Sequence, residues 1–390
     1  MRDLLYLAWR YLAYHRIKSA LLILSITLIL FLPAGLKIVV GKSVESLSSR
    51  AEATPLLIGA KGSPLELVLN ALYFESDAPP MMAYREWQRV AESGLAIPLY
   101  NGFYARKFPI VGTTLDYLDF RGLEIAIGRR MALIGECMVG ADVSEALGLT
   151  AGATLISSPE SVFDLAGVYP LKMQVVGILA RNGTPDDRAI IVDVKTAWII
   201  EGRAHGHQDL AQPEASSAVL KRDGEVIVAN ASVVKYNEIT PENRESFHFH
   251  GDVGSFPVSS IIVVPSDVKS GVLLQGRYLG EDERVQIVKP SVVMDELLGT
   301  ILTVQKYVIA AVVILGSSTL MTVALVFLLS LRLRKREIET MHRIGGAKHF
   351  VLGLMVSEVA VVLLVSGLIS VALTAAVSRY ADLLMRTFLM

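Results

Sequence analysis

Three long apolar stretches decide what this chain can fold into. They cover residues 19–40, with Lys37 as the only charge, residues 307–331, with no charge, and residues 351–377, with Glu358 alone. At 1.5 Å per residue, each stretch forms a helix long enough to cross a hydrocarbon core of about 30 Å. A cleaved signal peptide is the alternative for the first stretch, but its apolar core would be only about 7–15 residues long. The chain is therefore expected to span a membrane three times.

The overall composition agrees with a membrane protein and excludes several other classes. Hydrophobic residues make up 52% of the chain and charged residues 19%, below the roughly 25% of soluble proteins. The net charge of −1 provides no basic field, so no nucleic-acid partner is expected. Cys137 is the single cysteine, which rules out an intrachain disulfide and a zinc site built on cysteines.

Basic residues indicate which side of the membrane each segment faces. The lead 1–18 carries four basic residues and one acidic residue, and the segment 332–350 carries six and two. Short segments rich in Lys and Arg stay in the cytoplasm. We therefore predict a cytoplasmic amphipathic lead (1–18), span 1 (19–40), an extracytoplasmic domain with stalk helices at both ends (41–306), span 2 (307–331), a cytoplasmic segment (332–350), span 3 (351–377) and an amphipathic tail at the outer interface (378–390).

The predicted extracytoplasmic domain is long enough for a core of its own. Short runs rich in β-branched residues recur in it and predict strands at 173–179, 189–194, 225–236, 259–267 and 284–288. Helical patterns lie between them, at 82–93 and 139–149, and Gly and Pro punctuate the whole region. These alternating signals predict an α+β domain inserted between span 1 and span 2.

The chain carries no motif that would make it an enzyme. The stretch GLKIVVGKS (35–43) has five residues between its glycines, where a phosphate-binding P-loop has four. No G-x-S-x-G is present, and the adjacent side chains of Asp186 and Asp187 should diverge rather than converge. We therefore expect no catalytic residues and no cofactor in this chain, and any ATP would be bound by a separate subunit.

Two His-x-His pairs are the candidate metal ligands. They are His205 with His207 and His248 with His250. Imidazoles two residues apart lie on one face of a strand or loop, where they can share a metal ion, and Asp209 or Asp252 could add an oxygen ligand. The alternative is that Phe247 and Phe249 pack into the core and simply leave polar histidines facing outward.

The cytoplasmic segment has a break that a plain charged loop would not need. A basic helical run reaches Ile344 and is followed by Gly345 and Gly346, and then a new apolar helix begins. Glycines of this kind end a helix and let the chain turn. A short surface helix joined to two spans in this way can transmit motion from a cytosolic partner.

The motif KREIETMHRIGGA (335–347) resembles the coupling segment of FtsX-like permeases, the membrane subunits of MacB/LolC/DevC-type (type VII) ABC transporters. Glu358 falls where that family often has a Glu in the following span. Further segments, VVGILARNGTPDDRAIIVDVKTAWIIEG (175–202), VGADVSEALGLTAGATL (139–155) and LLIGAKGSPLELVLNALY (56–73), resemble family signatures in the same order along the chain.

The resemblance implies a permease that couples ATP hydrolysis by a cytosolic ABC ATPase to motion of its periplasmic domain, for export or extraction of a substrate. It implies a permease homodimer in the bacterial inner membrane, with a periplasmic adaptor or outer-membrane channel as a further partner. The implied ATPase-coupling residues are Arg336, Glu337, Arg343, Gly345, Gly346 and Glu358. The implied turn of the outer domain uses Gly183, Thr184, Pro185, Asp187 and Arg188.

The chain departs from the family in its number of spans. The family has one span before the outer domain and three after it, whereas two follow it here, so a fourth span was lost or the sequence is clipped. The alternative function is a membrane-anchored regulator or receptor without transport, such as an activator of cell-wall hydrolases or a metal-responsive outer domain. A pure receptor needs no ATPase subunit, which separates the two.

Overall fold

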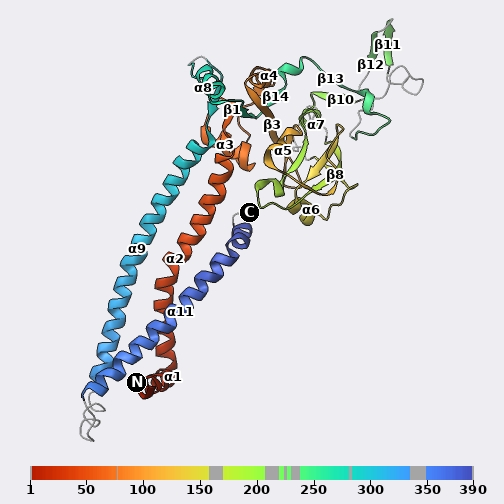
Figure 1. The fold of residues 1–390 in the computed structure, drawn as a ribbon. Helices are drawn as coiled ribbons and strands as arrows, with labels where there is room; N and C mark the ends of the chain where they lie inside the picture. Colours follow the sequence, from red (N-terminus) through yellow and green to blue (C-terminus); the bar gives the residue numbers. More distant parts are fainter. Residues whose placement is uncertain are drawn as a thin grey trace. The chain divides into compact units, whose positions relative to one another are not determined.

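The computed structural model describes residues 2–76, 78–157, 170–206, 219–223, 226–229, 238–280, 283–333 and 348–388. The chain divides into two compact units. One unit contains residues 1–49 and 295–390, and the other contains residues 50–294 (Figure 1). Each unit is described by itself below.

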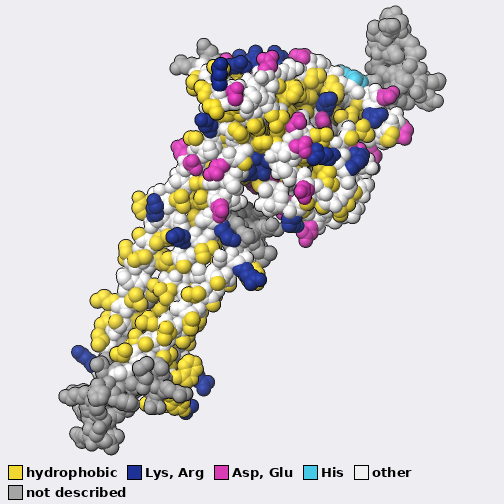
Figure 2. Space-filling model, in the orientation of Figure 1, with side chains coloured by type: hydrophobic (Ala, Val, Ile, Leu, Met, Phe, Trp, Pro, Cys, Tyr) yellow, Lys and Arg dark blue, Asp and Glu magenta, His cyan; other side chains and the backbone are white. Residues whose placement is uncertain are grey.

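The first unit is built from long helices. They are α1 (Arg2–Tyr14), α2 (Arg16–Glu52), α9 (Pro290–Leu333) and α11 (Lys348–Phe388). Segments of α2, α9 and α11 are long and apolar enough to cross a membrane. Hydrophobic side chains cover the outside of these helices (Figure 2), and Leu24, Ile314 and Leu364 are each more than 60% exposed. The prediction of three apolar helices, with an α+β domain between the first and the second, is confirmed.

Small and hydroxyl side chains bring these helices together. The Ser366 hydroxyl of α11 donates to the Ile23 carbonyl of α2 at 3.3 Å, and Thr27 donates to the Ser366 carbonyl at 3.4 Å. A Cβ at Gly316 of α9 would lie 2.8 Å from the Ile29 side chain, so glycine permits this close approach. Close packing through small residues and interhelical hydrogen bonds is typical of helices in lipid, where apolar burial gives little driving force.

Helix α2 passes through the whole GLKIVVGKS stretch, and also through Pro33, without interruption. The stretch therefore has no strand and no loop around its glycines. A phosphate-binding loop requires a strand, a glycine-rich turn and the start of a helix. The sequence match at 35–43 has the wrong local structure as well as the wrong spacing.

The second unit is a mixed sheet with helices packed around it. Its ten-stranded sheet runs in the order β16-β1-β15-β3-β4-β9-β6-β8-β5, with β7 paired to β8. The strands are β1 (Leu56–Ala60), β3 (Gly94–Ala105), β4 (Phe108–Thr113), β5 (Ile125–Gly128), β6 (Glu136–Val139), β7 (Thr154–Ile156), β8 (Lys172–Leu179), β9 (Ile190–Asp193), β15 (Ser260–Pro265) and β16 (Val285–Val288). The helices are α3 (Pro64–Tyr73), α4 (Arg85–Ala91), α5 (Asp116–Arg121), α6 (Ala141–Leu147), η1 (Pro185–Arg188), α7 (Val194–Ile200), η3 (Arg244–Ser246), η4 (Val253–Ser255) and α8 (Val268–Arg277).

Three short strand pairs complete the unit. They are β10 (Ala204–Gly206) with β13 (Phe247–Phe249), β11 (Val219–Asp223) with β12 (Val226–Ala229), and β14 (Pro257–Val258) with β2 (Met82–Ala83). Most of the predicted strands are present, and one prediction, the start of a helix, needs correction. The expected helix 82–93 begins with strand β2 and becomes helical only at Arg85, because Met82 and Ala83 pair with β14. The expected strand 225–236 is described only over its first part, as β12, and residues 230–236 lie outside the described residues.

The long strand β3 is shared by two halves of the sheet. Its first half pairs with β15 up to Leu99, and its second half pairs with β4 from Tyr100, with a register shift after Asn101. The Ser259 hydroxyl donates to the Leu99 carbonyl and accepts from the Asn101 amide, at 2.9 and 3.1 Å. A buried serine thus satisfies the backbone where β3 changes partners, as buried polar groups require.

Candidate functional site

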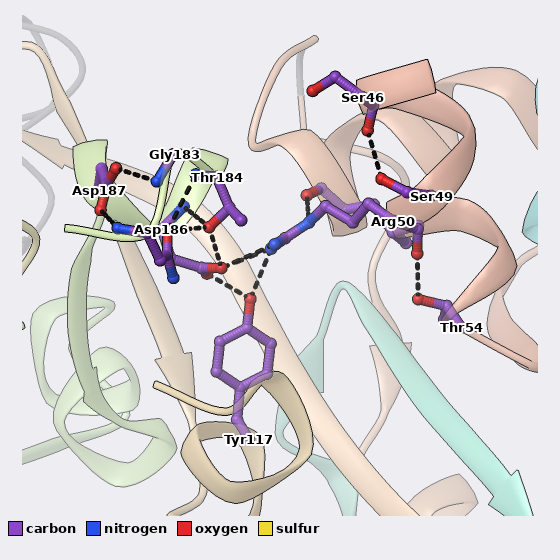
Figure 3. A network of polar contacts seen from close by, with 11 residues as sticks. Ser46, Ser49, Arg50, Thr54, Tyr117, Gly183, Thr184, Asp186 and Asp187 are labelled. Atoms are coloured by element: carbon purple, nitrogen blue, oxygen red, sulfur yellow. Dashed lines mark hydrogen bonds and ion pairs between the residues drawn. The ribbon is translucent and has the colours of Figure 1, made fainter. Parts of the chain in front are cut away.

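A buried polar network of the α/β unit is centred on Arg50, in the last turn of α2 (Figure 3). Its guanidinium donates to both carboxylate oxygens of Asp186, at 2.7 and 3.2 Å, and to the Tyr117 hydroxyl at 2.9 Å. Its Nε donates to the Leu72 carbonyl at the end of α3. The Tyr117 hydroxyl in turn donates to Asp186 at 2.7 Å. Two hydrogen bonds between one guanidinium and one carboxylate make the strongest kind of charged pair.

Burial sets the electrostatics of this network. Arg50, Tyr117 and Asp186 are all buried, with Asp186 only 1% exposed. Burial by itself would raise the pKa of the Asp186 carboxyl, but the charge and hydrogen bonds of Arg50 outweigh it and lower that pKa. Burial, followed by the negative charge of Asp186, raises the pKa of Tyr117 to about 12. Asp186 is therefore ionised and Tyr117 neutral at physiological pH.

A second arginine lies next to this network. The Arg121 guanidinium carbon is 4.8 Å from the centre of the Phe120 ring and 5.8 Å from that of Tyr117. Burial, then repulsion from Arg50, lowers the pKa of Arg121. The aromatic faces compensate part of the cost of placing a second cation here.

The turn predicted from 183–188 forms next to this network. Gly183 has a φ of 73°, a conformation that favours glycine, and Pro185 begins the short helix η1 with Thr184 as its N-cap. The Asp187 carboxylate accepts from the backbone amides of Asn182 and Gly183, at 3.0 and 2.7 Å. Asp187 therefore holds the turn, while Asp186 points the other way, toward Arg50, and half-buried Arg188 ends η1.

Two of the resembling sequence segments contact each other at this turn. The Gly140 amide donates to the Ala189 carbonyl at 2.9 Å, and a Cβ at Gly140 would collide with the carbonyl oxygens of Asp186 and Asp187. Glycine is therefore required where the loop before α6 passes η1. Arg181 adds ion pairs to residues of α6, which fasten the same two segments.

The predicted coupling residues are only partly visible. Arg336, Glu337, Arg343, Gly345 and Gly346 lie outside the described residues. Glu358 is described, in the apolar helix α11, and it is 3% exposed. A buried carboxyl group in an apolar helix of this kind is costly.

The structure brings three of the four predicted histidines together. His205 on β10 lies directly opposite His248 on β13, and His250 follows on the same side. His207 and Asp209 lie outside the described residues. The Asp252 carboxylate is engaged elsewhere, because it accepts from the Gly254 amide at 2.9 Å and lies 3.6 Å from Arg85.

The sequence analysis missed Arg50, Tyr117 and Asp186. Arg50 and Asp186 are 136 residues apart, and Arg50 stands among charged residues that are typical of an exposed helix. The one local signal for this site is weak: Arg50 is a basic residue at the end of a long helix that precedes a β-rich domain.

No protein-family model matches the chain, and no curated protein matches it. Solved structures do match. The extracellular domain of the noncanonical ABC-type transporter YknZ from Gram-positive bacteria is 12% identical, with 60% of this chain and 98% of that chain covered and a TM-score of 0.32. The periplasmic region of MacB from Actinobacillus actinomycetemcomitans is 9% identical, with 66% and 97% covered and a TM-score of 0.35.

Proposed function

We propose that this chain is the permease subunit of an ABC transporter of the MacB and FtsX type, in the inner membrane of a bacterium. A separate cytosolic ATPase binds and hydrolyses ATP, and two copies of the permease pass its closure on to their extracytoplasmic domains. The observation that carries the proposal is the motif at 335–347, which lies between two helices long enough to cross a membrane.

The lengths of the helices support transmission of motion. Helix α2 has 37 residues and α9 has 44, so at about 1.5 Å per residue each exceeds the roughly 30 Å of a hydrocarbon core. Each is described as a single helix. A continuous helix of this kind can transmit a displacement from one end to the other.

The last turn of α2, from Arg50 onward, belongs to the α/β unit, and Arg50 bonds it to the other elements of that unit. Its guanidinium joins α2 to the Leu72 carbonyl of α3, to Tyr117 of α5 and to Asp186 of η1. Movement of the last turn of α2 would therefore carry these three elements with it. In this proposal the network is a mechanical anchor, and its residues have no part in bond chemistry.

The proposal is tested by reconstituting the full chain in liposomes with a candidate ABC ATPase from the same organism. We expect the permease to bind the ATPase and to change its rate of ATP hydrolysis. A pure receptor would do neither, so absence of both effects would contradict the proposal.

Two variants test the coupling segment within the same assay. Replacing Gly345 and Gly346 by Leu favours helix by roughly 1 kcal/mol for each glycine removed and extends one helix through the expected turn. Arg336→Glu reverses a charge at the expected contact. We expect the double variant to bind the ATPase without coupling to it, and Arg336→Glu to bind more weakly. Lys269→Glu, an equal charge reversal on the exposed surface of the α/β unit, is the matched control and should behave as the parent does.

A further inference from the structure

The histidines form a compact group on one face of a two-stranded ribbon. His205 on β10 is paired in register with His248 on β13, and the Arg203 carbonyl accepts from the His250 amide at 3.0 Å, which extends the ribbon by one pair. His248 and His250 are two residues apart, so their side chains share a face of the strand. One imidazole from β10 therefore faces two from the segment of β13.

The three imidazole rings converge. The ring centres are 5.3 Å apart for His205 and His248, and 4.6 Å apart for each of the other two pairs. One nitrogen from each ring can be chosen so that all three lie within 4.8 Å of one another. Among the described residues, this is the group that could hold a metal ion.

The opposite face of the ribbon fixes its position. Phe247 and Phe249 pack against the hydrophobic core, and the Phe249 ring centre lies 6.4 Å from that of buried Trp198. A Cβ at Gly206 would lie within 2.5 Å of the Phe247 ring, so glycine is needed for the ring to close over β10. The phenylalanines thus anchor the ribbon on its core-facing side. The same alternation of residues that places them in the core places the histidines on the opposite face.

The Ser246 carbonyl favours one tautomer of the neutral His248 ring. Its Nδ1 lies 3.0 Å from the Ser246 carbonyl oxygen, which can only accept, so Nδ1 carries the hydrogen in the neutral ring. The lone pair is then at Nε2. A carbonyl that binds one ring nitrogen and so directs the other is a recurrent feature around histidines that bind metals.

We propose that His205, His248 and His250 form a binding site for a divalent transition-metal ion of the zinc class. Metal–imidazole bonds of about 2.0–2.1 Å place two nitrogens of a tetrahedral site about 3.3 Å apart. The nitrogens must therefore close by up to about 1.5 Å, which exposed His248 and His250 can do by rotation about their side-chain bonds. Three imidazoles favour zinc, copper or nickel over calcium or magnesium, which take oxygen ligands.

The site lies at the surface, where an ion can enter. Histidine atoms are visible on the surface of the α/β unit in Figure 2. Three protein ligands leave the fourth tetrahedral position for water or for a ligand from outside. The proposed site is independent of the permease function and of the Arg50 network.

The test uses the full chain in detergent, purified with an affinity tag that contains no histidine. Zn²⁺ is titrated by calorimetry, and Co²⁺ is added to read the ligand geometry from its absorption bands. We expect one ion per chain, and binding weakened about tenfold or more in His205→Asn, His248→Asn and His250→Asn. His15→Asn, which removes an imidazole from the turn between α1 and α2, is the matched control and should bind as the parent does.

The exposed positions of His248 and His250 keep the test decisive, because their variants are expected to fold even where His205→Asn does not. Near-ultraviolet circular dichroism checks the fold of each variant. Undetectable Zn²⁺ binding by the parent at submillimolar ion would overturn the proposal. Stoichiometric binding that persists in both folded variants would overturn it equally.

Discussion

The α/β unit and the long helices satisfy their polar and apolar groups in opposite ways. In the α/β unit, strands such as β6 are fully buried, and the buried charged pair of Arg50 and Asp186 is hydrogen-bonded within the chain. In the long helices, large apolar side chains such as Ile314 and Leu364 face outward. The α/β unit thus carries its own core, whereas the long helices need lipid or a partner helix to cover them.

This difference predicts which single substitutions should lower the free energy of unfolding most. Removing one member of a buried ion pair leaves an unpaired charge in a medium of low dielectric constant. Removing a hydroxyl that bonds two helices lowers the free energy of unfolding much less. The backbone hydrogen bonds within each helix remain, and few polar groups are left unpaired. The predictions below run from the largest expected effect to the smallest.

The largest effect is expected for Asp186→Ala. It leaves the buried Arg50 guanidinium without its carboxylate, which should lower the free energy of unfolding of the α/β unit by about 3–5 kcal/mol. Urea unfolding followed by tryptophan fluorescence measures it. Arg130→Ala is the control, since its ion pair with Asp119 is exposed, and it should stay within about 0.5 kcal/mol of the parent. Equal effects of the two substitutions would contradict the contrast drawn here.

An intermediate effect should appear at alkaline pH. The folded-state pKa of Tyr117 is raised to about 12, above the ordinary value of about 10. The stability linked to this raised pKa is complete below pH 10 and is lost as the pH rises toward 12. The loss should reach about 2–3 kcal/mol, at 1.36 kcal/mol for each pH unit. Tyr117→Phe removes this ionisation, so its stability should fall less steeply than that of the parent over the same range.

At acid pH, the ionisation of Asp186 makes stability change with pH in the opposite direction. The folded-state pKa of Asp186 is lowered, so its contribution is present above the unfolded value of about 3.9 and is lost as the pH falls through the folded value. The stability difference between the parent and Asp186→Asn should therefore narrow below about pH 4. A difference that stays constant between pH 7 and pH 3 would show that the charge of Asp186 does not matter.

The smallest effect is expected within the helical unit. Ser366→Ala removes the hydroxyl that donates to the Ile23 carbonyl, and should cost about 0.6 kcal/mol, the average for such bonds in a membrane protein. Reversible unfolding in mixed micelles measures it. Ser317→Ala is matched, because that hydroxyl donates within its own helix to Ile314 and is exposed. A loss from Ser366→Ala as large as that from Asp186→Ala would remove the distinction between the two units.

The sequence predicts the elements better than the contacts between distant ones. Strand β9 can be predicted because β-branched residues follow one another between turn signals. The spans can be predicted from their length and lack of charge. The start of the expected helix at 82–93 is wrong because pairing of β2 with β14 overrides a local helical pattern. Local periodicity carries no information about such a partner.

The same limit applies to the sites. The period of two predicts that His248 and His250 share a face, but only the register of β10 against β13 brings His205 to them. The turn at 183–188 was predicted from a motif, and Asp187 holds it. Its neighbour Asp186 binds an arginine 136 residues away, a pairing that depends on the folded sheet rather than on any local pattern.

The most direct test of the account is whether ATP binding at the cytosolic side moves the extracytoplasmic domains. Val268→Cys places a spin label on the α/β unit, at a position where the native side chain is 86% exposed. The native Cys137 is fully buried, and burial raises the pKa of its thiol to about 12, so Cys137 is not labelled. Double electron–electron resonance then gives the distance between labels on two protomers bound to the ATPase. The account predicts a shift of this distance between the nucleotide-free and ATP-trapped states, and no shift when Gly345 and Gly346 are both replaced by Leu. The same distance distribution in both states of the parent would contradict it.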